Sequence, residues 1–242
     1  ELYASGITTF EIKSGYGLDT ETEKLSLEIA SEFTEEVTFL GAHVVPAGSD
    51  PDEYTDLVAG KMLESITAKW VDVFCDTGAF TVAQAKKVLT AGIAAGLRPR
   101  MHANQLSNIG AIALAVELDC ASVDHCTFLD DADIELLKNS NTVATLLPGA
   151  EFSTRSPYPQ GGKLMKAGIA VALATDCNPG SSFTSSMAFC IALAVRDMGF
   201  SVDQAIWAAT KGGAMALRGN QGVLEVGSIA DFVVLDAPNH IL

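Results

Sequence analysis

The 242-residue sequence is poor in basic residues, with 15 Lys and Arg against 30 Asp and Glu and a net charge of −15. Binding to a phosphate backbone or to an anionic membrane surface depends on clustered Lys and Arg. This shortage argues against nucleic acid and membranes as partners. No stretch reaches the ~20 apolar residues needed to cross a bilayer, and the N-terminus lacks the basic-then-apolar pattern of a signal peptide. We expect a soluble protein.

Cysteine pairs are also missing. The five cysteines are odd in number, widely spaced and free of any C-x-x-C pair, so the sequence suggests neither a disulfide framework nor a zinc knuckle. A reducing cytoplasm fits this usage best. Cys75, Cys126 and Cys177 fall at or just past the ends of apolar runs, where a small, weakly polar side chain packs easily. We expect buried structural thiols rather than a nucleophile.

What the sequence does contain is a repeating unit. Its 48% hydrophobic residues suffice for one large core, and short apolar runs rich in β-branched residues recur along the chain, each short enough to be a strand. Their last residues, 13, 43, 75, 102, 126, 148 and 176, are 22 to 32 positions apart. The predicted strands are Ile7–Lys13, Val37–His43, Trp70–Cys75, Leu97–His102, Ala121–Cys126, Thr142–Pro148 and Gly168–Asp176.

Segments with helical spacing of apolar positions lie in most of the gaps. They are Thr20–Phe33, Pro51–Ala68, Val82–Gly96 and Asp130–Asn139, with Ser185–Met198 and Val202–Leu217 after the last strand. Nearly continuous apolar strands alternating with helices predict an α/β fold with a parallel sheet. Such a sheet is either open and doubly wound or closed into a (β/α)8 barrel.

The strand ends favour the barrel, because the functional residues of barrels lie at the carboxyl ends of the strands. Polar residues gather there: Lys13, His43, His102, His125 and Asp176. Three of the four histidines end apolar runs, and His240 is the exception. The predicted fold is therefore a (β/α)8 TIM-type barrel.

The pattern shows seven βα units, whereas a closed barrel needs eight. The segment Glu1–Ser5 resembles the end of a secondary-structure element that begins earlier. We expect a truncated chain in which residues 1–218 form a barrel lacking its first strand. After residue 218 the composition changes, and 222–227 followed by 229–235 reads as a pair of short strands with turn glycines. We expect residues 219–242 to begin the C-terminal part of a small β-domain.

Three residues carry the strongest chemical signal. His102 ends its run, and imidazole is a common ligand of zinc and iron, although a lone histidine is more often a hydrogen-bonded core residue. Asp176 follows at least five uncharged residues, so its carboxylate needs a cation, a metal or strong donors unless it caps the next helix. His125 can be a third ligand, a proton carrier or a residue packed beneath the loop 127–130. We expect His102 and Asp176 to converge on one cation.

Several motifs, taken in order, resemble those of the imidazolonepropionase family within the amidohydrolase superfamily. The resemblance covers essentially the whole chain, and the two stretches around Tyr16 and Asp176 are its most specific parts. The motifs are Ile12-Lys13-Ser14-Gly15-Tyr16-Gly17-Leu18-Asp19, Gly41-Ala42-His43, Met101-His102-Ala103-Asn104-Gln105, Val123-Asp124-His125, Leu146-Leu147-Pro148-Gly149 and Ala174-Thr175-Asp176-Cys177-Asn178-Pro179-Gly180-Ser181.

The resemblance implies a (β/α)8 barrel with a flanking β-sandwich, one bound zinc or iron, and often a homodimer. The implied reaction is hydrolysis of the cyclic amide C–N bond of 4-imidazolone-5-propanoate to N-formimidoyl-L-glutamate. His102 and Asp176 would be metal ligands, Asp176 would also shuttle the proton, and His125 would orient or polarise the reacting group. Contact with the small-molecule substrate would come from Tyr16, His43, Gln105, Asn178, Gly180 and Ser181.

Two departures from the family pattern stand out. The H-x-H pair of the first strand and an arginine soon after it have no counterpart, so we expect weak metal binding and little turnover from this chain alone. Gln105 stands where some members carry Glu, and an amide cannot act as an acid or base near neutral pH. Two other functions stay open: an amidohydrolase or deaminase for another cyclic amide or a nucleobase, and a catalytically inactive barrel fragment that dimerises through exposed edges.

Overall fold

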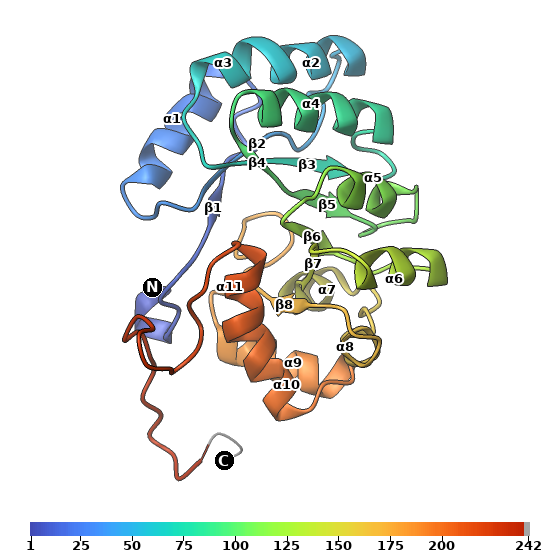
Figure 1. The fold of residues 1–242 in the computed structure, drawn as a ribbon. Coiled ribbons are helices and arrows are strands. Elements are labelled where there is room, and N and C mark those ends of the chain that lie inside the picture. Colours follow the sequence, from blue (N-terminus) through green and yellow to red (C-terminus); the bar gives the residue numbers. More distant parts are fainter. Residues whose placement is uncertain (240–242) are drawn as a thin grey trace. The chain divides into compact units, whose positions relative to one another are not determined.

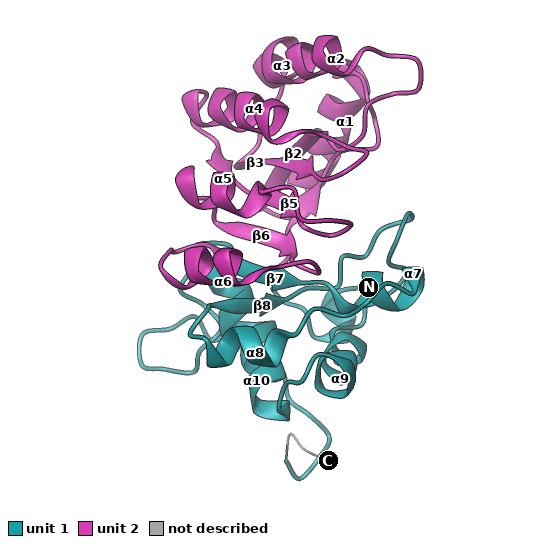
Figure 2. Cartoon of the chain, turned by 90° about the vertical axis from the view of Figure 1, so that its right-hand side faces the viewer, with its two compact units in different colours: residues 1–9, 143–242 teal, residues 10–142 magenta. Residues whose placement is uncertain are grey.

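The computed structural model describes residues 1–239 and divides them into two compact units. Unit 2 consists of residues 10–142, and unit 1 combines residues 1–9 with the chain from residue 143 onward (Figure 2). This division falls inside the predicted barrel segment 1–218, whose boundary with the segment 219–242 stays a prediction. Residue His240 and its two successors lie outside the described residues. In the described part, no helix is long and apolar enough to cross a membrane.

Unit 2 is built on parallel strands in the order β1-β2-β3-β5-β6, with β4 beside β3. Each main strand is followed by helical structure, and α1 packs on β2 while α4 packs on β3 (Figure 1). The α/β class predicted from the sequence is confirmed. The elements are β1 (Ile12–Lys13), α1 (Thr20–Ser31), β2 (Val37–Ala42), α2 (Pro51–Leu57), the π-helix η2 (Val58–Met62), α3 (Leu63–Ser65), β3 (Trp70–Cys75), α4 (Val82–Ala94), β4 (Arg98–Pro99), β5 (Met101–Ala103), α5 (Ala111–Glu117), β6 (Ser122–His125) and α6 (Asp131–Lys138).

Several helices of unit 2 begin where capping side chains accept hydrogen bonds from their first N–H groups. The Asp19 carboxylate accepts a hydrogen bond from the Thr22 N–H at the start of α1, and capping boxes start α4 at Thr81 and α6 at Asp130. Such caps contribute about 1 kcal/mol each. Behind them, large side chains fill the core completely, with Trp70, Phe39, Phe80, Leu27, Leu89 and Met62 all under 2% exposed.

Unit 1 holds the parallel pair β7 and β8 with their helices. Helix η3 packs on β8, and α11 contacts both strands. The close approach of η3 requires a glycine, because a Cβ on Gly212 would lie 2.2 Å from the carbonyl oxygen of Val171. The elements are the 3-10 helix η1 (Tyr3–Ser5), β7 (Val143–Leu146), α7 (Pro148–Thr154), α8 (Gly161–Lys166), β8 (Val171–Leu173), α9 (Met187–Asp197), α10 (Val202–Trp207), the π-helix η3 (Ala208–Gly212) and α11 (Gly213–Ala216).

The predicted pair of short strands at 222–227 and 229–235 is not formed in the described residues, because 219–239 contains no strand. Its apolar side chains are exposed, including Val226 and Val234. A two-stranded hairpin is at best marginally stable without a third strand or a helix to pack against. The β-domain predicted for this segment therefore stays a prediction.

Candidate active site

Five of the predicted site residues lie at the carboxyl ends of the strands of unit 2. Tyr16 follows β1, His43 follows β2, His102 lies within β5, Gln105 follows β5 and His125 ends β6. Parallel strands present their carboxyl ends at the same edge, which brings residues distant in sequence together. The exposed fraction of these residues falls from 56% for Tyr16 to 7% for His102 and 2% for His125. One end of this row of strand ends is therefore open to solvent, and the other end is buried in unit 2.

Ring contacts link four of these residues into one row. The ring centroids of Tyr16 and His43 are 5.1 Å apart, and those of His43 and Phe74 are 6.1 Å apart. Phe74 in turn lies 6.0 Å from His102, and His102 lies 5.5 Å from His125. We call these five side chains the ring row. Sequence analysis did not identify Phe74, which reads as an ordinary residue of an apolar strand.

The two faces of the sheet differ in character. On β3, Val71 packs against α4, whereas Asp72 and Phe74 point to the opposite face because side chains alternate along a strand. Phe74 is the register partner of His102, and His102 is the register partner of Asp124. Since register partners share a face, Asp72, His102 and Asp124 all lie on the face turned away from α4. That face is buried and charged.

Lys13, at the end of β1, pairs with three carboxylates on this face. Its Nζ lies 2.7 Å from Asp72 Oδ2, 3.2 Å from Asp124 Oδ2 and 3.1 Å from Glu11 Oε1. The guanidinium of Arg100 adds a second cation, with its Nε 3.3 Å from Glu11 Oε1. Buried charges are tolerated only when they are paired. Three carboxylates and two cations thus form one buried ionic network.

The network shifts the pKa values of its members. Burial alone would raise the pKa of Asp72, but the adjacent His102 and Lys13 outweigh it and hold that pKa far below its usual range. Burial would lower the pKa of His102, but the Asp72 carboxylate outweighs it and raises the pKa. Burial also opposes the charge of Lys13, yet Asp72, Glu11 and Asp124 raise its pKa. Asp72 is therefore ionised throughout the physiological pH range.

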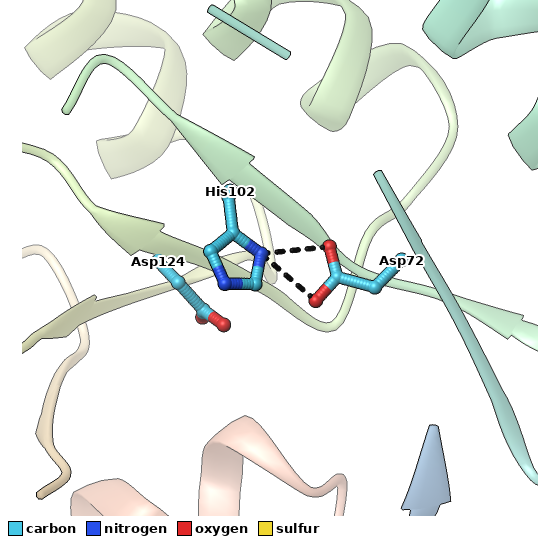
Figure 3. Close-up of side chains that lie close together, drawn as sticks. All are labelled: Asp72, His102 and Asp124. Atoms are coloured by element: carbon cyan, nitrogen blue, oxygen red, sulfur yellow. Dashed lines mark hydrogen bonds and ion pairs between the residues drawn. The ribbon is translucent and has the colours of Figure 1, made fainter. Parts of the chain in front are cut away.

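Among residues 1–239, one group of three side chains has ligand atoms close enough to hold a metal ion. Ligand atoms of Asp72, His102 and Asp124 all lie within 4.8 Å of one another (Figure 3). An imidazole with two carboxylates is a donor set that suits a divalent cation. The donor chemistry thus fits a metal. Both carboxylates, however, are already paired with the Lys13 ammonium, and the imidazole of His102 is not.

Asp72 and Asp124 are two further site residues that the sequence analysis missed. Each was visible as a single acid inside an otherwise uncharged run, Trp70-Val71-Asp72-Val73 and Ser122-Val123-Asp124. The argument applied to Asp176, that an acid in an apolar run needs a partner, applies equally to them. Both are buried, at 0% and 3% exposure.

A buried carboxylate organises the loop that carries Tyr16. Glu23, at 0% exposure, accepts hydrogen bonds from the backbone N–H groups of Gly15 at 2.9 Å, Gly17 at 2.7 Å and Leu18 at 3.1 Å. Leu18 adopts a left-handed backbone conformation with φ 60°, which the converging bonds help to hold. The conformation of this loop therefore depends on a residue of α1.

A second buried carboxylate does the same for the loop after β5. Asp76 accepts from the N–H groups of Gln105 at 2.7 Å, Leu106 at 2.8 Å and Ser107 at 3.1 Å, and from the Ser107 hydroxyl. Bonds to an ionised acceptor contribute about 1.5–3 kcal/mol each. The position of Gln105 is thus fixed by its backbone, which leaves the side chain amide to make other contacts.

The other predicted site residues, Asp176, Asn178, Gly180 and Ser181, belong to unit 1. Asp176 is half-buried and does not cap the next helix, because Ser186 is the N-cap of α9. Asn178 Oδ1 accepts from the N–H groups of Gly180 at 2.8 Å and Ser181 at 2.7 Å, and its Nδ2 donates to the Asp176 carbonyl at 2.6 Å. The Asn178 amide thus shapes this turn. The predicted metal-binding role of Asp176 stays a prediction.

Three predicted site regions share an unusual backbone. Asn104, His125 and Asp176 adopt positive φ angles of 55°, 79° and 49°, in the left-handed region that residues other than glycine seldom enter. Each stands at or just past the end of a strand. Such strain is found most often at binding and catalytic sites.

The cysteines follow the expectation with one exception. Cys75, Cys120, Cys126 and Cys190 are buried, but Cys177 is exposed. The expectation of a buried thiol at Cys177 was wrong, because the chain leaves the sheet after β8 ends at Leu173. The residue falls in the open turn that follows Asp176.

Comparison with known proteins places this site in a family. The sequence profile of the amidohydrolase family matches residues 79–242. Over 100% of its length the chain is similar to proteins named imidazolonepropionase, with 59% identity to that of Streptomyces coelicolor, 58% to that of Mycolicibacterium smegmatis and 53% to that of Nocardia farcinica. It spans 63%, 62% and 63% of the length of these three relatives.

Solved structures agree on the fold. Guanine deaminase from C. acetobutylicum matches with a TM-score of 0.73 at 15% identity, over 96% of this chain and 62% of that one. The A. niger ochratoxinase matches with a TM-score of 0.67 at 20% identity, over 96% and 66%. The barrel class predicted from the sequence is confirmed by these structures. The profile match covers more than half of the sequence, so the chain belongs to the amidohydrolase family.

Proposed function

We propose that this chain carries the active site of a hydrolase that opens the ring of 4-imidazolone-5-propanoate to give N-formimidoyl-L-glutamate. The observation that carries the proposal is the ring row, in which the predicted metal ligand His102 and the predicted substrate contacts Tyr16 and His43 join His125 through successive ring contacts. The identity of 53–59% with proteins named imidazolonepropionase favours this substrate among cyclic amides.

In this proposal His102 and Asp176 would hold one divalent metal, zinc or iron. When bound, such a metal would lower the pKa of a water to about 7 and so supply hydroxide near neutral pH. Asp176 takes the proton released when water adds to the ring carbonyl, and passes it to the departing ring nitrogen. His125, buried next to His102, orients the carbonyl and polarises it.

The remaining residues bind the substrate. Tyr16 and His43 form the exposed end of the ring row and contact the substrate ring, and Gln105 donates or accepts a hydrogen bond without acting as an acid or base. Ser181 and Gly180 contact the substrate from the turn that the Asn178 amide holds in shape. Phe74 supplies an apolar wall between His43 and His102.

The test replaces the matching stretch of the Streptomyces coelicolor relative with these 242 residues, so that the site is assayed at full length. Loss of 4-imidazolone-5-propanoate is followed by absorbance and the product by mass spectrometry, with guanine as a comparison substrate. We expect hydrolysis of the imidazolone alone, lost on Asp176→Ala and His102→Ala. A folded chimera that leaves the imidazolone intact, or that acts on guanine instead, would contradict the proposal.

The finer expectations on metal, compartment and assembly belong to the same proposal. We infer zinc or iron, a cytoplasmic location, a small-molecule substrate rather than nucleic acid or membrane, and a homodimer. Elemental analysis of the purified protein decides the metal, and sedimentation velocity decides the assembly. A monomer, or a preparation with neither metal, would contradict the respective expectation.

A further inference from the structure

The buried group Asp72–His102–Asp124 can be interpreted in two ways. The three residues can be joint ligands of a metal, or one of them can hold another in place. The hydrogen bonds distinguish these interpretations, because His102 Nδ1 lies 3.1 Å from Asp72 Oδ1 and 3.0 Å from Asp72 Oδ2. Asp72 thus faces the same ring nitrogen with both of its oxygens.

A carboxylate that accepts from Nδ1 fixes the imidazole tautomer. An ionised carboxylate can only accept, so in the neutral ring Nδ1 carries the hydrogen and Nε2 keeps its lone pair. Within the described residues, the hydrogen bonds of His102 all run through Nδ1. Figure 3 shows the second ring nitrogen on the side of the ring away from Asp72. Nε2 is therefore the ligand atom that this arrangement presents.

Asp72 is itself held by a cation. Lys13 Nζ lies 2.7 Å from Asp72 Oδ2, and Asp72 has 0% exposure. A metal bound directly to Asp72 would have to displace this ammonium or lie against it, which like charges oppose. Asp124 is paired with the same ammonium at 3.2 Å and accepts from the Ser122 hydroxyl at 2.7 Å.

We propose that Asp72 is a positioning residue that orients His102 with Nε2 toward the metal, and that Lys13 anchors Asp72 from its other side. The proposal rests on the proposed function in one respect, since it takes His102 as a metal ligand. Carboxylates that accept from the remote nitrogen of a ligating histidine fix its ring and increase its basicity. The three-residue group is then a support for one ligand rather than a ligand set.

The decisive substitution is Asp72→Asn. Two donors, the Lys13 ammonium and the His102 ring, would then compete for a single amide oxygen. The ammonium carries a full charge and therefore keeps the amide oxygen, so the NH2 of the new amide turns toward Nδ1. Nδ1 must then accept, and the ring hydrogen moves to Nε2, where it opposes metal binding. Asp124→Asn is the matched control, because Asp124 is buried on the same face and paired with the same lysine but, among the described residues, makes no hydrogen bond to His102.

The first measurement needs no metal and no activity. Long-range 1H–15N correlation spectra of the metal-free protein report which imidazole nitrogen carries hydrogen, with the His102 signals assigned by their absence in His102→Ala. At a pH above the pKa of His102 we expect the Nδ1–H form in the unmodified protein and in Asp124→Asn, and the Nε2–H form in Asp72→Asn. An Nε2–H form in the unmodified protein overturns the proposal even if the variant does not fold.

The second measurement uses Zn²⁺ alone, in competition with a chelator. Loss of such a support weakens metal affinity roughly 10- to 100-fold, so we expect that loss for Asp72→Asn and little change for Asp124→Asn. Equal losses for both variants would show joint ligands and overturn the proposal. Failure of the hydrolase assay with the expected tautomers would refute the proposed function and leave the orientation of His102 by Asp72 intact.

Discussion

Glu23 offers the sharpest test of how the Tyr16 loop is held, because its buried carboxylate binds three backbone N–H groups. The substitution Glu23→Gln keeps the size of the side chain and removes its charge. Glutamine has one acceptor oxygen, so it keeps at most the two bonds made by Oε1, to Gly17 and Leu18. The bond from Gly15 is lost, and the new NH2 group faces that N–H.

The magnitude follows from these bonds. Leaving one buried N–H unsatisfied costs about 1–3 kcal/mol, and two bonds that change from a charged to a neutral acceptor each lose on the order of 1 kcal/mol. We therefore expect the free energy of unfolding to fall by about 3–5 kcal/mol. Glu28→Gln is the control, because Glu28 is exposed on the same helix and, among residues 1–239, its carboxylate pairs only with Lys24, at 3.9 Å. It should change stability by less than about 0.5 kcal/mol.

Urea denaturation gives the free energy, and hydrogen exchange locates the change. We expect faster exchange of the Gly15, Gly17 and Leu18 amides in Glu23→Gln while the amides of β3 remain protected. The reasoning would be refuted by a loss below about 1 kcal/mol together with unchanged exchange in the loop. Equal effects from Glu28→Gln would also refute it, because the loss would then reflect helix charge rather than the loop.

Three further predictions concern packing, reactivity and pH. Gly212→Ala should destabilise the protein by about 1–3 kcal/mol, because the new Cβ would lie 2.2 Å from Val171 O. Gly213→Ala should stabilise it by up to ~1 kcal/mol, because nothing lies within 4 Å of that Cβ position. Thermal unfolding compares the two variants, and equal shifts of the melting temperature would contradict the packing described. A thiol reagent should modify Cys177 alone in the native protein, since the other cysteines are buried; mass spectrometry finding rapid labelling elsewhere would disprove this. Burial lowers the pKa of His43 below its ordinary value of 6.5, so the folded state favours the neutral ring. The stability that this residue contributes above pH 6.5 should therefore be lost as the pH falls through the folded pKa. His43→Gln should flatten that part of the plot of stability against pH, and an unchanged slope would contradict the prediction.

The sequence predicted those elements whose pattern is long and local. Trp70–Cys75 matches β3 at both ends, and the helix predicted from Val82 begins there in α4. The helices α5, α7 and α8 were missed because six or seven residues hold too few turns for a periodic pattern. The π-helix η2 within the predicted helix Pro51–Ala68 was missed as well, because the regular period of an α-helix cannot reveal one wider turn.

Features that the sequence predicted only in part, or not at all, also have physical explanations. Only Ile12–Lys13 of the predicted strand Ile7–Lys13 pairs, because β2 begins at Val37, opposite Ile12. The sequence identified the histidines of the ring row, since each ends an apolar run. It did not reveal the ionic network, because Lys13 and Asp72 are 59 positions apart. Their contact is set by strand register, which local patterns do not encode.

The left-handed backbone at Asn104, His125 and Asp176 has a consequence for protein engineering. A residue with a Cβ costs about 1–2 kcal/mol in that conformation, and glycine avoids the cost. Asn104 and His125 are buried, and Asn104 donates hydrogen bonds to Phe128 O and Asp133 Oδ2 that glycine would lose, whereas Asp176 is only half-buried. Selection of variants for heat tolerance alone would therefore reward glycine at Asp176. A library screened that way would lose the carboxylate proposed to move the proton, so it needs a turnover screen run alongside.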